Sequence, residues 1–164
     1  MRPLTEREIR AAFVNCTKGE ATRLSIPRDL ADRPWPDLDF LGWRDHKSPE
    51  RAYLATESGI GLVAIALRVP APSAARTARR GMCALCLTVH DTGVPLMVAA
   101  KAGKAGRQGD SVGTYICGDL ACSLYVRGRR DPGTAGRMHE SLTSEDKAAR
   151  LVANLTAFLT KIQS

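Results

Sequence analysis

The sequence predicts an α+β fold in which a mainly antiparallel sheet is flanked by an N-terminal and a C-terminal helix. Apolar residues recur at helical spacing near both ends of the 164-residue chain. Between them, two apolar segments separated by Ser58-Gly59 are typical of a β-hairpin. A chain of this length suits one compact domain, so we expect residues 1–164 to form a single unit.

We expect residues 1–70 to contain a helix and the hairpin. Thr5 and Glu8 have the spacing of a capping box, and Gly19 is expected to end the helix that follows. Cys16 falls on the apolar face of that helix, where a small core residue is expected. Residues 20–26 are predicted as a short strand and residues 27–40 as an irregular connection. The hairpin comprises residues 51–57 and 60–69, and its continuously apolar second arm predicts a central strand.

Residues 70–75 are rich in proline and alanine and predict a linker. Two further strands are predicted at residues 94–100 and 111–116, with a glycine- and lysine-rich loop at residues 101–109 between them. A capping signal at Thr143 begins an amphipathic helix over residues 143–163, which we expect to pack on the core. Its apolar face is predicted to comprise Ala148, Leu151, Val152, Leu155, Phe158, Leu159 and Ile162.

Four of the five cysteines form two closely spaced pairs, Cys83 with Cys86 and Cys117 with Cys122. The charged N-terminal residues do not resemble a secretion signal, so we expect a cytoplasmic protein whose thiols stay reduced. Zinc prefers a tetrahedron of soft ligands, and two such pairs supply one. A strand, a hairpin and a helix with one pair at each end predict a treble-clef finger over residues 76–130, holding one structural Zn²⁺. A buried thiol cluster and a redox dithiol are the alternatives.

One of the three histidines is a candidate for an additional ligand. His90 lies four residues after Cys86 and could replace one thiolate. Because four cysteines already complete the tetrahedron, we expect His90 to be an exposed hairpin residue. We expect His46 and His139 to be solvated.

The net charge of +7 is concentrated around the cysteines, since residues 76–137 contain ten Lys or Arg and four Asp or Glu. Part of this excess offsets the formal −2 of a four-thiolate zinc site. The remainder suits a polyanionic partner such as RNA, the ribosome or an acidic protein face. If zinc joins the hairpin to the helix, two basic clusters could form one partner-binding face: Lys101, Lys104 and Arg107, and Arg127, Arg129 and Arg130.

No pattern in the chain predicts an enzyme. Four thiolates close the zinc coordination shell, whereas a catalytic zinc keeps a position for water. Asp37 and Asp39 are paired carboxylates for which turn and cap roles are expected. We also expect no small-molecule substrate. No membrane partner is expected either, because the longest apolar run, residues 60–67, is about half the length of a membrane-spanning helix.

The cysteine pairs and their flanks resemble the elongation factor G-binding proteins, also called the fibronectin-binding-protein domain family. This family includes the fusidic-acid-resistance proteins. The resemblance rests on Cys83-x-x-Cys86, on Thr114-Tyr115-Ile116-Cys117 with Cys122, on residues 38–45 and on the final helix. It implies a ribosome-associated protein that binds elongation factor G and promotes its release. The resistance proteins also carry an N-terminal helical bundle, whereas a single short helix is predicted before the sheet here. We therefore expect no such bundle, which places drug protection in doubt more than factor binding.

Three functions follow from these observations. The leading expectation is a translation-associated module that binds elongation factor G, the ribosome or both. The second is a zinc-finger protein that binds RNA phosphates, including those of ribosomal RNA, through its basic loops. The third is a redox or metal-handling protein.

Overall fold

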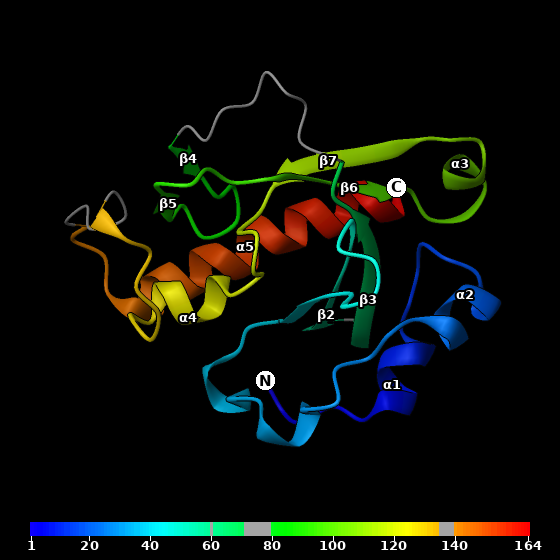
Figure 1. Cartoon of the computed structure of the whole chain (residues 1–164), viewed down its shortest axis with the longest axis horizontal. Coiled ribbons are helices and arrows are strands. Elements are labelled where there is room, and N and C mark those ends of the chain that lie inside the picture. Colours follow the sequence, from blue (N-terminus) through cyan, green and yellow to red (C-terminus); the bar gives the residue numbers. More distant parts are fainter. Residues whose placement is uncertain (60, 71–79, 135–139) are drawn as a thin grey trace.

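The computed structural model describes residues 1–59, 61–70, 80–134 and 140–164, and it confirms the α+β fold (Figure 1). A five-stranded sheet has the order β1-β2-β3-β6-β7 with antiparallel neighbours, and β4 pairs with β5 in a separate two-stranded sheet. The strands are β1 (Leu41–Arg44), β2 (Arg51–Ser58), β3 (Gly61–Arg68), β4 (Gly81–Met82), β5 (Val89–His90), β6 (Leu96–Ala100) and β7 (Ser111–Tyr115). The helices are α1 (Glu6–Ala11), α2 (Lys18–Arg23), η1 (Leu30–Asp32), η2 (Trp35–Asp37), α3 (Gly103–Arg107), α4 (Cys122–Val126) and α5 (Ser144–Gln163).

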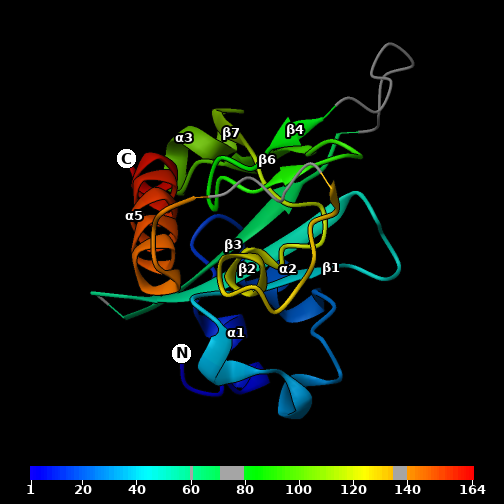
Figure 2. The same ribbon diagram turned by 90° about the vertical axis from the view of Figure 1, so that its left-hand side faces the viewer.

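The hairpin of β2 and β3 forms the centre of the molecule because both of its faces are buried. Alternate side chains of a strand point to opposite faces. Leu54 and Ile65 therefore belong to the core shared with α5, whereas Tyr53 and Ala64 belong to the core beneath the N-terminal helices. Figure 2 shows α5 and α1 on opposite sides of these strands. The predicted hairpin and its central second arm are thus confirmed.

The outer edge of β3 is completed by three different partners along its length. The Ala64 amide donates to Ala12 O (2.9 Å), and Ala64 O accepts from the Val14 amide (3.0 Å). Two residues further, the Asn15 side chain accepts from the Ala66 amide (2.8 Å) and donates to Ala66 O (2.9 Å) and to Ala100 O (3.1 Å) of β6. In the described part of the chain, regular backbone pairing of β3 with β6 is limited to Arg68, opposite Val98. A side chain therefore substitutes for backbone pairing at this joint.

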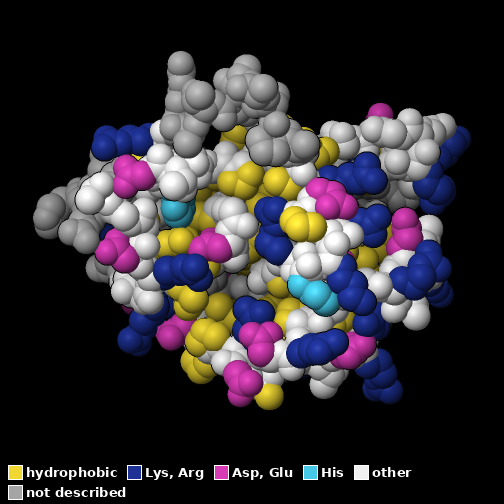
Figure 3. Space-filling model, in the orientation of Figure 1, with side chains coloured by type: hydrophobic (Ala, Val, Ile, Leu, Met, Phe, Trp, Pro, Cys, Tyr) yellow, Lys and Arg dark blue, Asp and Glu magenta, His cyan; other side chains and the backbone are white. Residues whose placement is uncertain are grey.

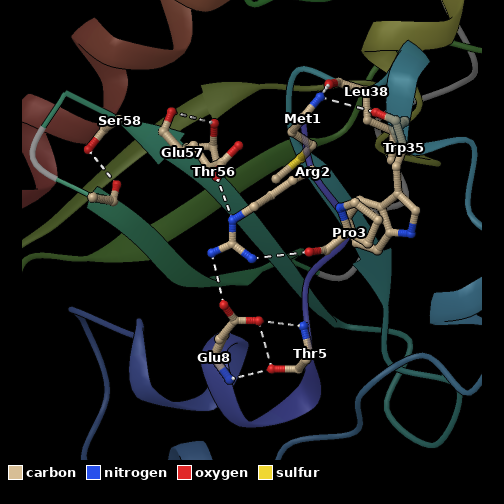
Figure 4. Close-up of polar contacts among 11 residues, drawn as sticks. Met1, Arg2, Pro3, Thr5, Glu8, Trp35, Leu38, Thr56, Glu57 and Ser58 are labelled. Atoms are coloured by element: carbon tan, nitrogen blue, oxygen red, sulfur yellow. Dashed lines mark hydrogen bonds and ion pairs between the residues drawn. The ribbon is translucent and has the colours of Figure 1, made fainter.

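The N-terminal residues are attached to the sheet by a polar network (Figure 4). The Met1 amino group donates to Trp35 O (3.1 Å) and Leu38 O (2.7 Å). Arg2 lies between Glu8 (2.8 Å) on α1 and Glu57 (3.1 Å) on β2. These contacts connect the segment before α1 to both η2 and the central hairpin.

Residues 20–26 are not the predicted strand, and Gly19 does not end the first helix. Helix α1 ends at Ala11 because the next residues pair with β3, and Gly19 lies inside α2. Thr17 and Glu20 form a second capping box, which nucleates this short helix.

Residues 101–109 are not wholly the predicted loop, because they contain α3. This segment is fixed from outside: the Ala102 amide donates to Ile162 O (2.7 Å) at the end of α5. Strands β6 and β7 on either side are confirmed.

The C-terminal helix α5 is confirmed, with its capping box at Thr143. Leu151, Leu155, Phe158, Leu159 and Ile162 are buried, but Val152 is 45% exposed and does not belong to the predicted apolar face. Among the described residues, no helix combines the length and hydropathy required to cross a membrane. Residues 71–75 of the predicted linker lie outside the described residues.

Candidate metal centre

The first cysteine pair lies on the turn between β4 and β5. The Leu87 amide donates to Cys83 O (2.9 Å), and the Cys83 amide donates to Thr88 O (2.9 Å), so the chain reverses tightly around the two sulfurs. Leu87 has a φ of 60°, in the left-handed region that non-glycine residues rarely adopt. This turn, which includes a residue in an unfavourable backbone conformation, places Cys83 and Cys86 on the same side of the chain.

The second pair follows β7 and opens α4. Cys117 lies just beyond the strand, and Cys122 is the first residue of the helix. Between them the Leu120 amide donates to Cys117 O (2.9 Å), and Leu120 has a φ of 57°. Both cysteine loops thus place a leucine in the left-handed region, although the first turn closes over four residues and the second over three.

The four sulfur atoms form a tetrahedral cluster of the size that zinc requires. All four lie within 4.8 Å of one another and belong to buried residues. Cys83 Sγ is 3.7 Å from Cys122 Sγ, and Cys86 Sγ is 3.5 Å from Cys117 Sγ. Zinc–sulfur bonds of about 2.3 Å in a tetrahedron place sulfur atoms about 3.8 Å apart. Disulfides, whose sulfurs are about 2 Å apart, are excluded.

The protonation chemistry of the cluster also fits a metal ion. Hydrogen bonds from Cys117 and Cys122 lower the pKa of the Cys83 thiol. The pKa of Cys122 is raised by its hydrogen bonds to the same cluster, beginning with Cys117, and by burial. Four buried sulfurs cannot all ionise without a cation, whereas bound Zn²⁺ supplies two positive charges and stabilises each thiolate. The site therefore holds one structural zinc ion, as predicted.

His90 is not the exposed hairpin residue that we expected. Its Nε2 lies 3.2 Å from Cys117 Sγ, and its half-buried ring makes an edge-on contact with Tyr125 at 4.9 Å. Tyr125 in turn donates to Asp119 Oδ2 (2.7 Å), and burial followed by this hydrogen bond raises the pKa of the phenol. His90 is thus a neighbour of a ligand, placed to donate a hydrogen bond to the Cys117 thiolate.

The other two histidines had been expected to be solvated. His46 is exposed and lies 3.0 Å from Ser25 Oγ. His139 is outside the described residues.

The zinc finger packs as part of the main hydrophobic core and does not form a separate subdomain. All four cysteines share one buried cluster with Leu54, Ile65 and the apolar face of α5. Asn154 on α5 donates to Leu85 O (2.9 Å) inside the first cysteine turn. The centre therefore joins the sheet to the C-terminal helix.

Asp39 and Asp37 pair with arginines that follow helix α4. These ion pairs, and not the expected turn and cap roles, are what the structure shows for the two carboxylates. Arg127 makes two hydrogen bonds to Asp39, at 2.6 and 2.9 Å, and both side chains are largely buried. Arg129 lies 3.7 Å from Asp37 and is more exposed. Sequence reasoning missed these pairs because their partners are far apart along the chain.

The two basic clusters do not form the single face that we predicted. Helices α3 and α4 lie towards opposite sides of the molecule in Figure 1. Arg127, Arg129 and Arg130 each pair with an aspartate, the last with Asp119 at 3.2 Å. Lys104 and Arg107, by contrast, are exposed and make no ion pair in the part of the chain that is described. Lys101 is half-buried and reaches Ser164 O at 3.4 Å.

The knuckle, hairpin and helix around four cysteines define a treble-clef zinc-finger protein. Residues 8–162 match the family described as FBP C-terminal treble-clef zinc-finger, and the chain belongs to that family. The match extends across both sides of the linker and includes α1, the central hairpin and α5. No curated protein and no solved structure is significantly similar to the chain.

Proposed function

We propose that this protein is a non-enzymatic, cytoplasmic binding module that contacts elongation factor G on the ribosome and promotes its release. The observation that carries the proposal is membership of the FBP treble-clef family over residues 8–162. The cysteine pairs and flanks of this chain, quoted above, resemble those of the elongation factor G-binding proteins. The four-thiolate shell supports a structural role for the metal, because it has no open position for substrate.

The hairpin tip around α3 is the surface that we assign to the partner. Lys104 and Arg107 project from a tip held by β6, β7 and the end of α5, so little conformational freedom is lost on binding. Lys and Arg side chains are numerous at this end of the molecule, on the right of Figure 3. Arg127, Arg129 and Arg130 are weaker candidates because their charges are already paired.

Binding of the purified chain to purified elongation factor G and to ribosomes, measured by biolayer interferometry, tests the proposal. Lys104→Glu with Arg107→Glu should weaken binding, and the loss should be larger at low salt than at high salt. Arg7→Glu with Lys47→Glu reverses two exposed charges away from the tip and serves as the matched control.

The outcomes separate a protein partner from an RNA partner. Binding to elongation factor G that resists nuclease supports the proposal. Recovery of ribosomes or RNA that disappears after nuclease treatment favours the RNA-binding alternative, whose affinity should fall steeply as salt rises. Absence of measurable binding to the factor, with or without ribosomes, would refute the proposal.

A further inference from the structure

A cavity of about 710 Å³ lies away from the zinc centre, between α2, one end of the β2–β3 hairpin and the α3 turn. This volume is in the range of pockets that hold small organic ligands, about 300–1,000 Å³. Leu24, Leu67 and Val98 provide apolar lining, and Ser111 provides a hydroxyl group. The cavity therefore has the size and mixed character of a ligand site.

Two arginines at the cavity are placed directly opposite each other. Arg51 and Arg68 are register partners on β2 and β3, and both line the cavity. Residues opposed in this way have Cβ atoms about 4.5–5.5 Å apart, and like charges there destabilise the sheet. Arg23 on α2 adds a third guanidinium to the lining. The fold thus gathers three positive charges at a place where they repel.

No carboxylate relieves this repulsion by direct pairing. Among the described residues, none of the three arginines takes part in an ion pair. The cavity also contains Glu20 and Asp45, and both are hydrogen-bonded to other groups. The pKa of Glu20 is lowered first by its Thr17 hydrogen bonds and then by the charges of Arg23 and Arg51, so its carboxylate offsets part of the repulsion at a distance. Glu20 Oε2 accepts from the Thr17 amide (2.7 Å) and hydroxyl (2.8 Å) in the α2 cap.

Asp45 is held in the same way by the β1–β2 connection. Its Oδ1 accepts from the Lys47 amide (2.9 Å) and its Oδ2 from the Tyr53 hydroxyl (3.2 Å). Burial, followed by the charge of Asp45, raises the pKa of Tyr53 to about 12, so the phenol stays protonated and donates. The Arg51 guanidinium also faces the Tyr53 hydroxyl, where its charge and hydrogen bond act to lower the pKa of the phenol. Its other N–H donors remain available to a ligand.

We propose that this cavity binds a phosphorylated small molecule of nucleotide size, with its phosphate groups between Arg51 and Arg68. Guanidinium groups bind phosphate oxygens through paired hydrogen bonds. A bound phosphate replaces the repulsion between the two arginines with two attractions. The apolar side chains contact the organic part of the ligand. The cavity adjoins α3 through Gly106, but Lys104 and Arg107, the side chains assigned to the partner surface, do not line it.

Isothermal titration calorimetry and thermal unfolding of the zinc-loaded full chain, with ADP, pyrophosphate and adenosine as probes, test the proposal. ADP and pyrophosphate should bind and raise the unfolding temperature, whereas adenosine, which has no phosphate, should not. Arg51→Gln and Arg68→Gln should each weaken ADP binding at least tenfold. Each should also raise the unfolding temperature of the ligand-free chain, because one of the two opposed charges is removed. Zinc content measured after each titration controls for chelation by the probes.

Arg7→Gln removes an exposed arginine outside the cavity and should leave ADP binding unchanged. Tighter binding of ADP than of pyrophosphate identifies a nucleotide-like ligand, and equal binding identifies the phosphate group as the feature recognised. The proposal is overturned if ADP and pyrophosphate give no signal at about 1 mM. It is equally overturned if adenosine binds as tightly as ADP, or if the two cavity variants bind ADP as Arg7→Gln does.

Discussion

Gly42 on β1 lies against the loop that joins Cys117 to Cys122, and this contact couples the sheet to the metal centre. A Cβ at position 42 would be 2.4 Å from Leu120 Cβ and 3.0 Å from Leu120 O. Carbon atoms normally approach no closer than about 3.5 Å, so Gly42→Ala requires a separation of about 1 Å. Leu120 cannot move alone, because its amide is bound to Cys117 O.

We expect Gly42→Ala to destabilise the protein by about 1–3 kcal/mol, the usual cost of overpacking. Zinc should also be released faster to a chromogenic chelator, since Cys117 and Cys122 flank the displaced loop. Urea unfolding measures the first effect and stopped-flow absorbance the second. Gly59→Ala is the matched control, because a Cβ there meets no atom within 4 Å.

A double-mutant cycle isolates the contact itself. Leu120→Gly removes the Cβ that clashes, so the two substitutions together should cost less than their separate effects added. Unchanged stability and zinc release in Gly42→Ala, or strict additivity with Leu120→Gly, would refute the reasoning.

Four further measurements have expected outcomes. Purified protein should contain one zinc per chain by elemental analysis. Chelation should expose amides of α4, β4, β5 and α5 to hydrogen exchange before those of β2 and β3, because α5 packs on the cysteine cluster; uniform exposure would contradict this. Asp39→Asn should cost about 1–3 kcal/mol in urea unfolding, since it breaks a largely buried bidentate pair, whereas Asp37→Asn at the exposed Arg129 pair should cost less than about 0.5 kcal/mol. Equal costs would show that burial does not govern these pairs. Burial, followed by the charge of Glu20, raises the pKa of Cys16 to about 11. Its alkylation rate in the zinc-loaded protein should therefore keep rising above pH 9 and approach a plateau only beyond pH 11, and a midpoint near 9.0, the value of a free thiol, would contradict it.

Patterns within short stretches of the sequence correctly predicted the zinc ligands and the central strand. The cysteine spacing located the zinc ligands, and the apolar run at residues 60–69 located the central strand β3, because each pattern lies within a few residues. The same signals misassigned residues 20–26, where the capping box of Thr17 and Glu20 overrode a short apolar pattern. Helix α3 was missed because glycine disfavours helices and tertiary contacts hold this segment.

Contacts between distant residues were beyond the reach of sequence patterns. His90 meets Cys117 across 27 residues, and Arg127 meets Asp39 across 88. In the sequence, each of these four residues has several possible partners. The pairing is determined only when the folded chain brings two of them together. The failure of the predicted single basic face has the same origin in part, because two arginines assigned to a partner-binding face pair instead with Asp37 and Asp39.

The joint at Asn15 has a consequence for how the native state opens. Between Ala64 and Arg68 the sheet is continuous only through one carboxamide, which holds Ala66 on β3 and Ala100 on β6. Rotation of this one side chain frees three hydrogen bonds without disturbing either buried core. The edge of β3 at Ala66 can therefore open locally at a free-energy cost well below that of global unfolding, while the core that β3 and β6 share stays packed. Exchange of the Ala66 amide hydrogen reports that opening directly, because its acceptor is the Asn15 side chain.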